Sequence, residues 1–166
     1  MRVLGVDPGT AITGYGVVED SGDELRALAF GVVRTPADLP LAARLQTIYR
    51  ELRALASRWQ PPVAAIEELF FSANARTAMN VGQARGVVLL ALADAGLEIA
   101  EYSPLEVKQA VTGYGGADKA QMQEMVRLLL GLEGVPRPDD AADALAVAIC
   151  HLHSARLAAL ARADAT

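Results

Sequence analysis

Three consecutive β-type segments joined by short turns open the chain, and this start restricts the fold more than any other feature. Residues 3–6 form a short apolar run, Asp7-Pro8-Gly9 has the chemistry of a turn, and strand-favouring residues return at 15–18. A third strand is predicted over residues 25–33 and ends before Thr35-Pro36. Because tight turns join antiparallel strands, the first unit is predicted to be three antiparallel strands.

Helices alternate with strands in the rest of the chain. Residues 38–59 show helical periodicity, with arginines on one face and apolar residues on the other, namely Leu39, Ala42, Leu45, Ile48, Tyr49 and Leu52. Further strands are predicted over residues 63–66 and 97–102, and further helices over residues 73–95, 104–112, 118–130 and 138–162. This order predicts an α/β fold in which a mixed five-stranded sheet has helices on both faces. No repeat or composition shift divides the chain, so we expect a single domain over residues 1–166.

The composition is that of a folded protein, with 52% hydrophobic and 21% charged residues. The N-terminus does not resemble an export signal, and the longest apolar run, residues 141–150, is shorter than the roughly 20 residues of a membrane span. The single cysteine, Cys150, excludes an internal disulfide and agrees with a reducing compartment. We therefore expect a cytoplasmic protein with no membrane partner. The net charge of −5 argues weakly against nucleic acid as a ligand, although local positive charge decides such binding.

Three carboxylates lie in apolar surroundings. Asp7 ends the first apolar strand, Glu67 follows the apolar run 63–66, and Asp143 is the only polar residue in the helical stretch 141–150. An ionised carboxylate in such surroundings is costly unless it is paired or binds a cation. Because no basic residue lies within a helical turn of Asp143, a cation is its expected partner.

Asp140 and Asp143 lie three residues apart, so on a helix their side chains project from the same face. They can meet Asp7 only if the last helix packs across the sheet beside the first strand. Carboxylate oxygens suit Mg²⁺ or Mn²⁺ rather than zinc. Two such ions, about 3.5–4 Å apart, can activate a water and stabilise the leaving oxygen in phosphodiester hydrolysis.

Simpler roles remain open for some of these acids. Asp139 and Asp140 lie at a helix start, where acids cap the helix and favour its dipole. Asp7 precedes Pro-Gly and could be a turn residue. Glu67 and Glu68 should point to opposite faces of a strand, and the sequence pattern does not choose between them.

With these features the chain resembles the RuvC family of bacterial Holliday junction resolvases, which have a ribonuclease H-like fold. The resemblance runs over residues 2–155, and each matching motif alone is weak, whereas their shared order is specific. The motifs are Gly5-Val6-Asp7-Pro8-Gly9 with Thr13-Gly14-Tyr15-Gly16-Val17, Ala65-Ile66-Glu67, Gly82-Gln83-Ala84-Arg85-Gly86, Val107-Lys108-Gln109, and Asp140-Ala141-Ala142-Asp143-Ala144-Leu145-Ala146.

The resemblance implies that Asp7, Glu67, Asp140 and Asp143 bind the metal, and it selects Glu67 over Glu68. Some family members have His at the position of Asp140, so its role is the least fixed. The family's cofactor is Mg²⁺, for which we expect Mn²⁺ to substitute, with two ions in each active site. A homodimer would nick two strands of a four-way DNA junction symmetrically and leave ligatable 5′-phosphate and 3′-hydroxyl ends, in recombination and repair. The RuvA–RuvB branch-migration complex is the implied partner.

Only two lysines, Lys108 and Lys119, occur beside thirteen arginines, and both lie between the second and third groups of acids. A compact positive charge is one reason to use lysine there, and solvated surface positions are the alternative. The resemblance favours the first and implies that both lysines lie next to the scissile phosphate, with catalytic and DNA-binding roles. The flexible stretch 113–116 between them could let the backbone approach phosphate.

Two adjacent phenylalanines, Phe70 and Phe71, follow the strand that ends in Glu67. An exposed ring there could stack on an unpaired base, although both rings could equally be core, and the resemblance favours Phe70 as the DNA contact. Arg76 and Arg85 are further candidates for phosphate contacts.

The helix predicted over residues 73–95 carries a partly small, apolar stripe of Met79, Gly82, Gly86 and Leu90. By resemblance this stripe is the dimer contact, and the alternative is that it packs on its own sheet.

Three other functions compete with a junction nuclease. A sugar kinase or actin-like ATPase begins with a similar Asp-x-Gly-Thr hairpin, but it needs two such domains and this chain is about half the required length. A junction-binding protein without activity would gain nothing from acids placed beside phosphate. A related nuclease acting on RNA fits the Asp140–Asp143 pair and the Phe70 segment less well.

Overall fold

The computed structural model describes residues 1–68 and 75–163, without the side chains of residues 75–77. Within these residues five strands form one sheet in the order β3-β2-β1-β4-β5, namely β1 (Arg2–Asp7), β2 (Ile12–Asp20), β3 (Leu25–Arg34), β4 (Val63–Glu67) and β5 (Glu98–Tyr102). The first three strands pair antiparallel, whereas β4 pairs parallel with both β1 and β5. The predicted mixed five-stranded sheet is therefore confirmed.

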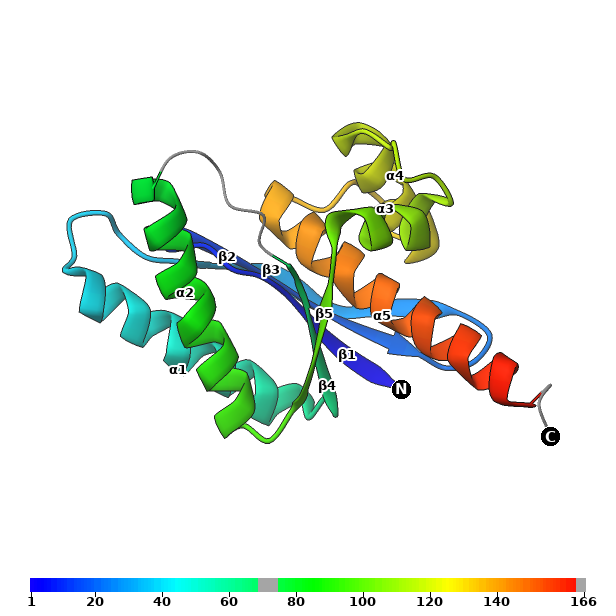
Figure 1. The fold of residues 1–166 in the computed structure, drawn as a ribbon, viewed down its shortest axis with the longest axis horizontal. Coiled ribbons are helices and arrows are strands. Elements are labelled where there is room, and N and C mark those ends of the chain that lie inside the picture. Colours follow the sequence, from blue (N-terminus) through cyan, green and yellow to red (C-terminus); the bar gives the residue numbers. More distant parts are fainter. Residues whose placement is uncertain (69–74, 164–166) are drawn as a thin grey trace.

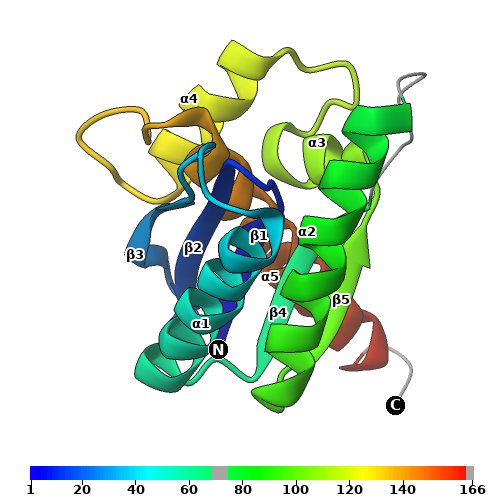
Figure 2. The same ribbon diagram turned by 90° about the vertical axis from the view of Figure 1, so that its left-hand side faces the viewer.

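Helices cover both faces of this sheet (Figure 1). Two of them, α1 (Leu41–Trp59) and α2 (Ala75–Asp94), lie side by side on one face, as Figure 2 shows. The long helix α5 (Asp139–Ala163) crosses the other face, with α3 (Pro104–Thr112) and α4 (Lys119–Leu129) packed against it. The arrangement agrees with the predicted α/β class with helices on both faces.

Alternating side chains of the central strands enter two separate cores. Leu4, Val6 and Ile66 pack against α1 and α2, whereas Val3 and Ala65 pack against α5. Because successive strand residues point to opposite faces, the residues that end β1 and β4, Asp7 and Glu67, carry their side chains on the α5 face.

Among the described residues, two elements differ from their predicted bounds by more than one residue. The first helix begins at Leu41 and not at residue 38, because Pro40 disfavours helical backbone in the residue before it and occupies the N-cap position. Strand β2 covers residues 12–20 rather than 15–18, because Gly14, despite its low strand propensity, pairs with Asp7 on one side and Val32 on the other. Of the predicted helix over residues 73–95, residues 73 and 74 lie outside the described part of the chain.

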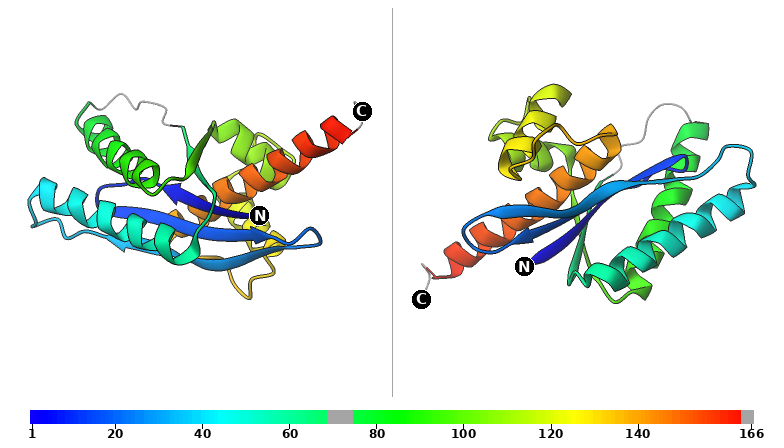
Figure 3. Two further views of the ribbon diagram at one scale, coloured as in Figure 1. Left: turned by 90° about the horizontal axis from the view of Figure 1, so that it is seen from below. Right: turned by 180° about the vertical axis from the view of Figure 1, so that it is seen from behind.

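The helix α5 is long and apolar enough to cross a membrane when judged by length and composition alone, and it is the only such helix among the described residues. In the structure, residues 141–150 other than Asp143 are buried against the sheet and the neighbouring helices, as in the core helix of a globular domain. Its C-terminal end runs past the sheet (Figure 3), and there Leu157 and Leu160 are exposed.

The apolar stripe on α2 does not pack on its own sheet. Met79, Gly82, Gly86 and Leu90 are all exposed, with Met79 66% and Leu90 55% accessible. The opposite side of the helix is buried against the sheet instead, through Ala84, Val88, Ala91 and Leu92. The alternative that the stripe belongs to the core is therefore wrong.

Candidate active site

Glycines in β1 and β2 allow α5 to lie directly on the sheet. A Cβ atom on any of three glycines of these strands would overlap the helix: Gly5 the Ala144 carbonyl oxygen, Gly14 the Asp140 carbonyl oxygen and Gly16 the Leu145 side chain. At Gly5 and Gly14, where the overlap is with helix backbone, any larger residue would push the helix away. The close approach brings the acids at the start of α5 to the strand that ends in Asp7. This is the packing that a meeting of Asp140 and Asp143 with Asp7 was predicted to need.

Asp7 lies in the middle of a group of negative charges. Its strand is the parallel neighbour of β4, with Val6 paired to Ile66, so Asp7 and Glu67 end adjacent strands on the same edge of the sheet. Burial and three nearby carboxylates raise the pKa of the Asp7 side chain from 3.8 to about 7; in order of effect they are Asp143, Asp140 and Glu67. A cation placed among these groups would offset the cost of an ionised carboxylate that is removed from water, and it would reduce the repulsion between the carboxylates.

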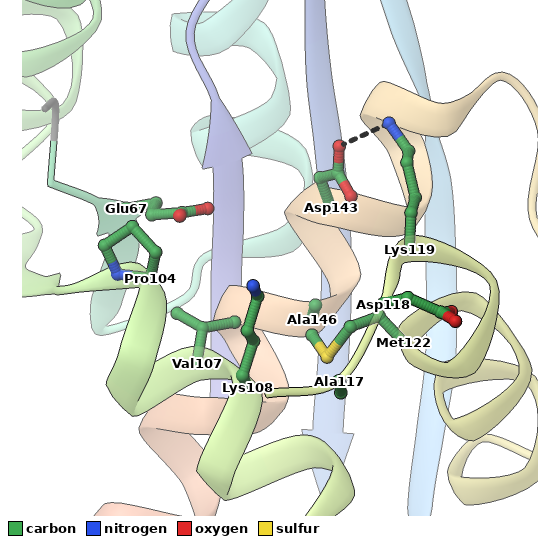
Figure 4. A pocket seen from close by; sticks show the side chains of 10 residues that line it. All are labelled: Glu67, Pro104, Val107, Lys108, Ala117, Asp118, Lys119, Met122, Asp143 and Ala146. Carbon is green, nitrogen blue, oxygen red and sulfur yellow. Dashed lines mark ion pairs between the residues drawn. The ribbon is translucent and has the colours of Figure 1, made fainter. Parts of the chain in front are cut away.

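Glu67 opens onto a cavity of about 300 Å³ between the end of β4 and the helices α3, α4 and α5. Figure 4 shows Glu67, Lys108, Lys119 and Asp143 around this cavity, each from a different element. Burial, followed by the charge of Asp143, raises the pKa of the Glu67 side chain, and Lys108 opposes the shift. Two predicted metal ligands and both predicted catalytic lysines therefore line one cavity.

Asp143 has a basic partner that the sequence did not reveal. Its carboxylate oxygen Oδ2 lies 3.6 Å from the Nζ atom of Lys119, the first residue of α4, and its side chain is 39% exposed. Burial raises the pKa of Asp143, and Lys119 lowers it. The inference that no basic residue reaches Asp143 is thus wrong, because Lys119 arrives from a helix that is distant in the sequence, whereas the role of Asp143 as a metal ligand stays a prediction.

The carboxylates are grouped but not arranged as ligands. In residues 1–68 and 75–163, no three Asp, Glu, His or Cys side chains converge closely enough to hold one metal ion. Asp143 faces Lys119 instead (Figure 4). The donors suit a hard divalent cation in type and charge, because all are carboxylate oxygens and their mutual repulsion favours a cation.

The remaining predicted DNA contacts have different outcomes. Phe70 lies outside the described residues, as does the side chain of Arg76. The Arg85 side chain is only 12% exposed, and its guanidinium bonds within the protein, to the Glu67 backbone carbonyl at 2.6 Å and to the Glu101 carboxylate. Its predicted contact with phosphate is therefore not favoured by this geometry.

Asp139 contributes to the site in a way that the sequence did not indicate. A capping role was open for it, but it is the first residue of α5 and its Oδ2 atom lies 3.1 Å from Lys119 Nζ. Its Oδ1 atom accepts a hydrogen bond from Arg137 at 2.7 Å. The hydrogen bond from Lys119, followed by one from Gln123, lowers the pKa of Asp139. No local sequence signal connects Asp139 with Lys119, because the pair depends on how α4 packs on α5.

Residues 3–151 match the family model described as crossover junction endodeoxyribonuclease RuvC. The chain is 63% identical to the protein of that name from Chloroflexus aggregans over 155 residues, which cover 93% of this chain and 94% of the relative. It is 54% identical to the one from Syntrophomonas wolfei over 166 residues, covering 100% and 96% of the two chains.

Solved structures agree with these matches. The fold superposes on RuvC of T. thermophilus in complex with a Holliday junction substrate with a TM-score of 0.91 and 40% identity, covering 95% of this chain and 96% of the other. The yeast mitochondrial Holliday junction resolvase Ydc2 shares the fold at 14% identity, with a TM-score of 0.64 over 92% of this chain and 79% of its own. On the strength of the family model and these identities, the chain belongs to the RuvC family of crossover junction endodeoxyribonucleases.

Proposed function

We propose that this chain is a Mg²⁺-dependent endonuclease that resolves Holliday junctions in DNA recombination and repair, acting as a single nuclease domain. The observation that carries this proposal is the partly buried Asp7 carboxylate at the end of β1, whose pKa is raised to about 7 beside three other carboxylates. A bound divalent cation would neutralise the charge of such a carboxylate and so stabilise its ionised form, which is the form that binds metal. The similarity to RuvC of T. thermophilus, which was solved with a Holliday junction substrate, supports the choice of substrate.

Asp7, Glu67, Asp140 and Asp143 are the proposed metal ligands. Two Mg²⁺ ions held by these groups would supply an activated water and stabilise the leaving oxygen in phosphodiester hydrolysis, and Mn²⁺ is expected to substitute. If Asp143 binds the metal, its contact with Lys119 Nζ at 3.6 Å would weaken, while Lys119 would keep its contact with Asp139 at 3.1 Å.

Lys108 and Lys119 are proposed to hold the scissile phosphate and to neutralise charge that develops on it. Both line the cavity between Glu67 and Asp143, so a phosphate group there would lie between two ammonium groups and the carboxylates. Phe70 is proposed to stack on an unpaired base, and Arg76 to contact phosphate.

A homodimer formed through α2 would give the two active sites that symmetric nicking requires. The exposed stripe of Met79, Gly82, Gly86 and Leu90 supports this contact, because a Cβ atom on either glycine would meet open space and a second helix could approach closely. The products are expected to carry 5′-phosphate and 3′-hydroxyl ends. We further propose a cytoplasmic location and cooperation with the RuvA–RuvB complex.

The experiment that tests this function compares a labelled four-way junction with a linear duplex of the same sequence, each incubated with the protein in Mg²⁺ and in EDTA. The proposal predicts symmetric nicks in the junction with Mg²⁺, no cutting in EDTA and little cutting of the duplex. Equal cutting of both DNAs would contradict junction specificity. Tight junction binding with no cutting would favour a binding protein.

A further inference from the structure

Arg85 joins the ends of two strands from a position on α2. Its Nη1 atom donates a hydrogen bond to the Glu67 carbonyl oxygen at 2.6 Å, and its Nη2 atom pairs with the carboxylate of Glu101 in β5. The Arg85 side chain is 12% exposed, whereas that of Glu101 is 44% exposed. A guanidinium can make both contacts at once because its donors form a rigid planar fork.

The bond to Glu67 is made at the last residue of β4. Ile66 of β4 is paired with Glu101 of β5, and the ladder closes with the Glu68 N–H donating to the Tyr102 carbonyl oxygen at 2.7 Å. Arg85 therefore holds the backbone where the strand ends. The Glu67 side chain lies on the α5 face of the sheet, whereas Arg85 approaches from the α2 face. Arg85 therefore contacts the Glu67 backbone from the side opposite to the Glu67 carboxylate.

We propose that Arg85 is a positioning residue, which fixes the end of β4 and with it the Glu67 carboxylate in the orientation that binds the metal, and that Glu101 holds Arg85 in place. The inference rests on the proposed function, since it assigns Glu67 to the metal. Groups that orient metal ligands in this way commonly change metal affinity or activity about 10- to 100-fold when they are replaced.

Substitution of Glu101 distinguishes this positioning role of Arg85 from a direct contact between Arg85 and phosphate. If Arg85 binds phosphate, the Glu101 carboxylate competes with DNA, and Glu101→Gln should tighten junction binding and leave the Mg²⁺ requirement unchanged. If Arg85 positions Glu67, Glu101→Gln should instead raise the Mg²⁺ requirement in the same direction as Arg85→Gln. The two roles thus predict different effects of one substitution.

The test uses the full chain with Arg85→Gln, Arg85→Lys and Glu101→Gln. Mg²⁺ is titrated in two assays, cleavage of a four-way junction and the thermal stability of the protein without DNA. Junction affinity is measured in EDTA at several salt concentrations. Arg156→Gln is the matched control, because Arg156 also joins a carboxylate, that of Asp20, and a backbone carbonyl, that of Gly22 at 3.1 Å, but does so away from the cavity.

Arg85→Gln and Glu101→Gln should raise the half-saturating Mg²⁺ concentration about 10- to 100-fold in both assays. Their junction affinity and its salt dependence should stay within twofold of wild type, with Arg85→Lys between wild type and Arg85→Gln. Arg156→Gln should lower thermal stability without changing the Mg²⁺ midpoint.

A different set of results would overturn the inference. If Arg85 contacts phosphate, Arg85→Gln should weaken junction binding, reduce the slope of log affinity against log salt by about 0.9 and leave the Mg²⁺ midpoint unchanged. A wild-type Mg²⁺ midpoint in Glu101→Gln would equally contradict it. If the wild-type protein fails to cut junctions, the proposed function itself is wrong, which is a separate outcome.

Discussion

A side chain on Gly14 of β2 would overlap the carbonyl oxygen of Asp140 at the start of α5. Gly14 is also the residue paired with Asp7 in the β1–β2 ladder. The helix backbone therefore rests on the sheet beside the central carboxylate, and this contact sets the separation between the strand acid and the helix acids.

Gly14→Ala should displace the start of α5. Forcing a methyl group into packed backbone costs about 1–3 kcal/mol of unfolding free energy, and the shift moves Asp140 and Asp143 away from Asp7. We expect cleavage to fall far more than the loss of folded protein explains, when urea unfolding and cleavage are measured on one preparation. Gly134→Ala, where a Cβ atom meets open space, is the control. Wild-type stability and cleavage in Gly14→Ala would contradict the packing account.

Removal of the Lys119 charge should reduce cleavage without preventing junction binding. Lys119 lies against Asp139 and Asp143 and lowers the pKa of Asp143. Lys119→Gln is expected to cut about 100-fold more slowly, because a positive charge near the reacting phosphate is lost. The pH at half-maximal cleavage should rise, because Asp143 then stays protonated to higher pH. Lys119→Arg, which keeps the positive charge, should retain more activity than Lys119→Gln. Equal cleavage rates for the wild type and both variants would exclude a role of the Lys119 charge in cleavage.

The adjacent acids Asp139 and Asp140 should behave differently. Asp140 is a proposed metal ligand and contributes to the raised pKa of Asp7, whereas Asp139 pairs with Arg137 and Lys119. Asp140→Asn is expected to lose cleavage, and Asp140→His to retain part of it, because imidazole can also bind a metal. Asp139→Asn should cut within a few-fold of wild type. Similar losses in Asp139→Asn and Asp140→Asn would show that a shared helix-start role, not metal binding, explains both.

The metal-free protein should lose stability as the pH rises through the range set by Asp7. Its pKa is about 7 in the folded state against 3.8 for an unperturbed carboxyl group, so between these values the folded state binds more protons. The stability contributed by protonated Asp7 is complete below pH 3.8 and disappears by about pH 7, a change of about 4 kcal/mol for a three-unit difference.

Asp7→Asn removes this titration and should flatten the profile of unfolding free energy between about pH 4 and pH 7 in EDTA. Mg²⁺ should stabilise the wild-type protein at pH 8 and should stabilise Asp7→Asn much less, because the carboxylate that the ion neutralises is gone. Superimposable pH profiles for the two proteins would contradict the placement of the Asp7 charge in a partly buried cluster of carboxylates.

Local pattern was enough to predict most of the fold. Apolar runs and turn residues predicted all five strands, and helical periodicity predicted the helices, with α3 correct at both ends. The periodicity predicts the start of α1 three residues too early, because Pro40 disfavours helical backbone in the residue before it and occupies the N-cap position. In β2, two glycines obscured a strand whose length depends on pairing with both neighbours.

The site was predictable only where an acid conflicts with its local surroundings. Asp7 and Asp143 stand out because each ends or interrupts an apolar segment, whereas the choice of Glu67 over Glu68 and the proposed role of Asp140 come from the resemblance to the family. Pairings that depend on tertiary packing were invisible, above all Lys119 with Asp139 and Asp143. The contacts of Arg85 with Glu67 and Glu101 were hidden for the same reason, since they join three elements.

The most direct measurement of the central claim is junction binding and cleavage by wild type, Asp7→Asn and Asp143→Asn with Mg²⁺. Both variants should bind a labelled four-way junction as tightly as wild type or more tightly, because a negative charge beside phosphate has been removed, and neither should release nicked product. Cleavage by either variant at the wild-type rate would contradict the assignment of these carboxylates to the metal.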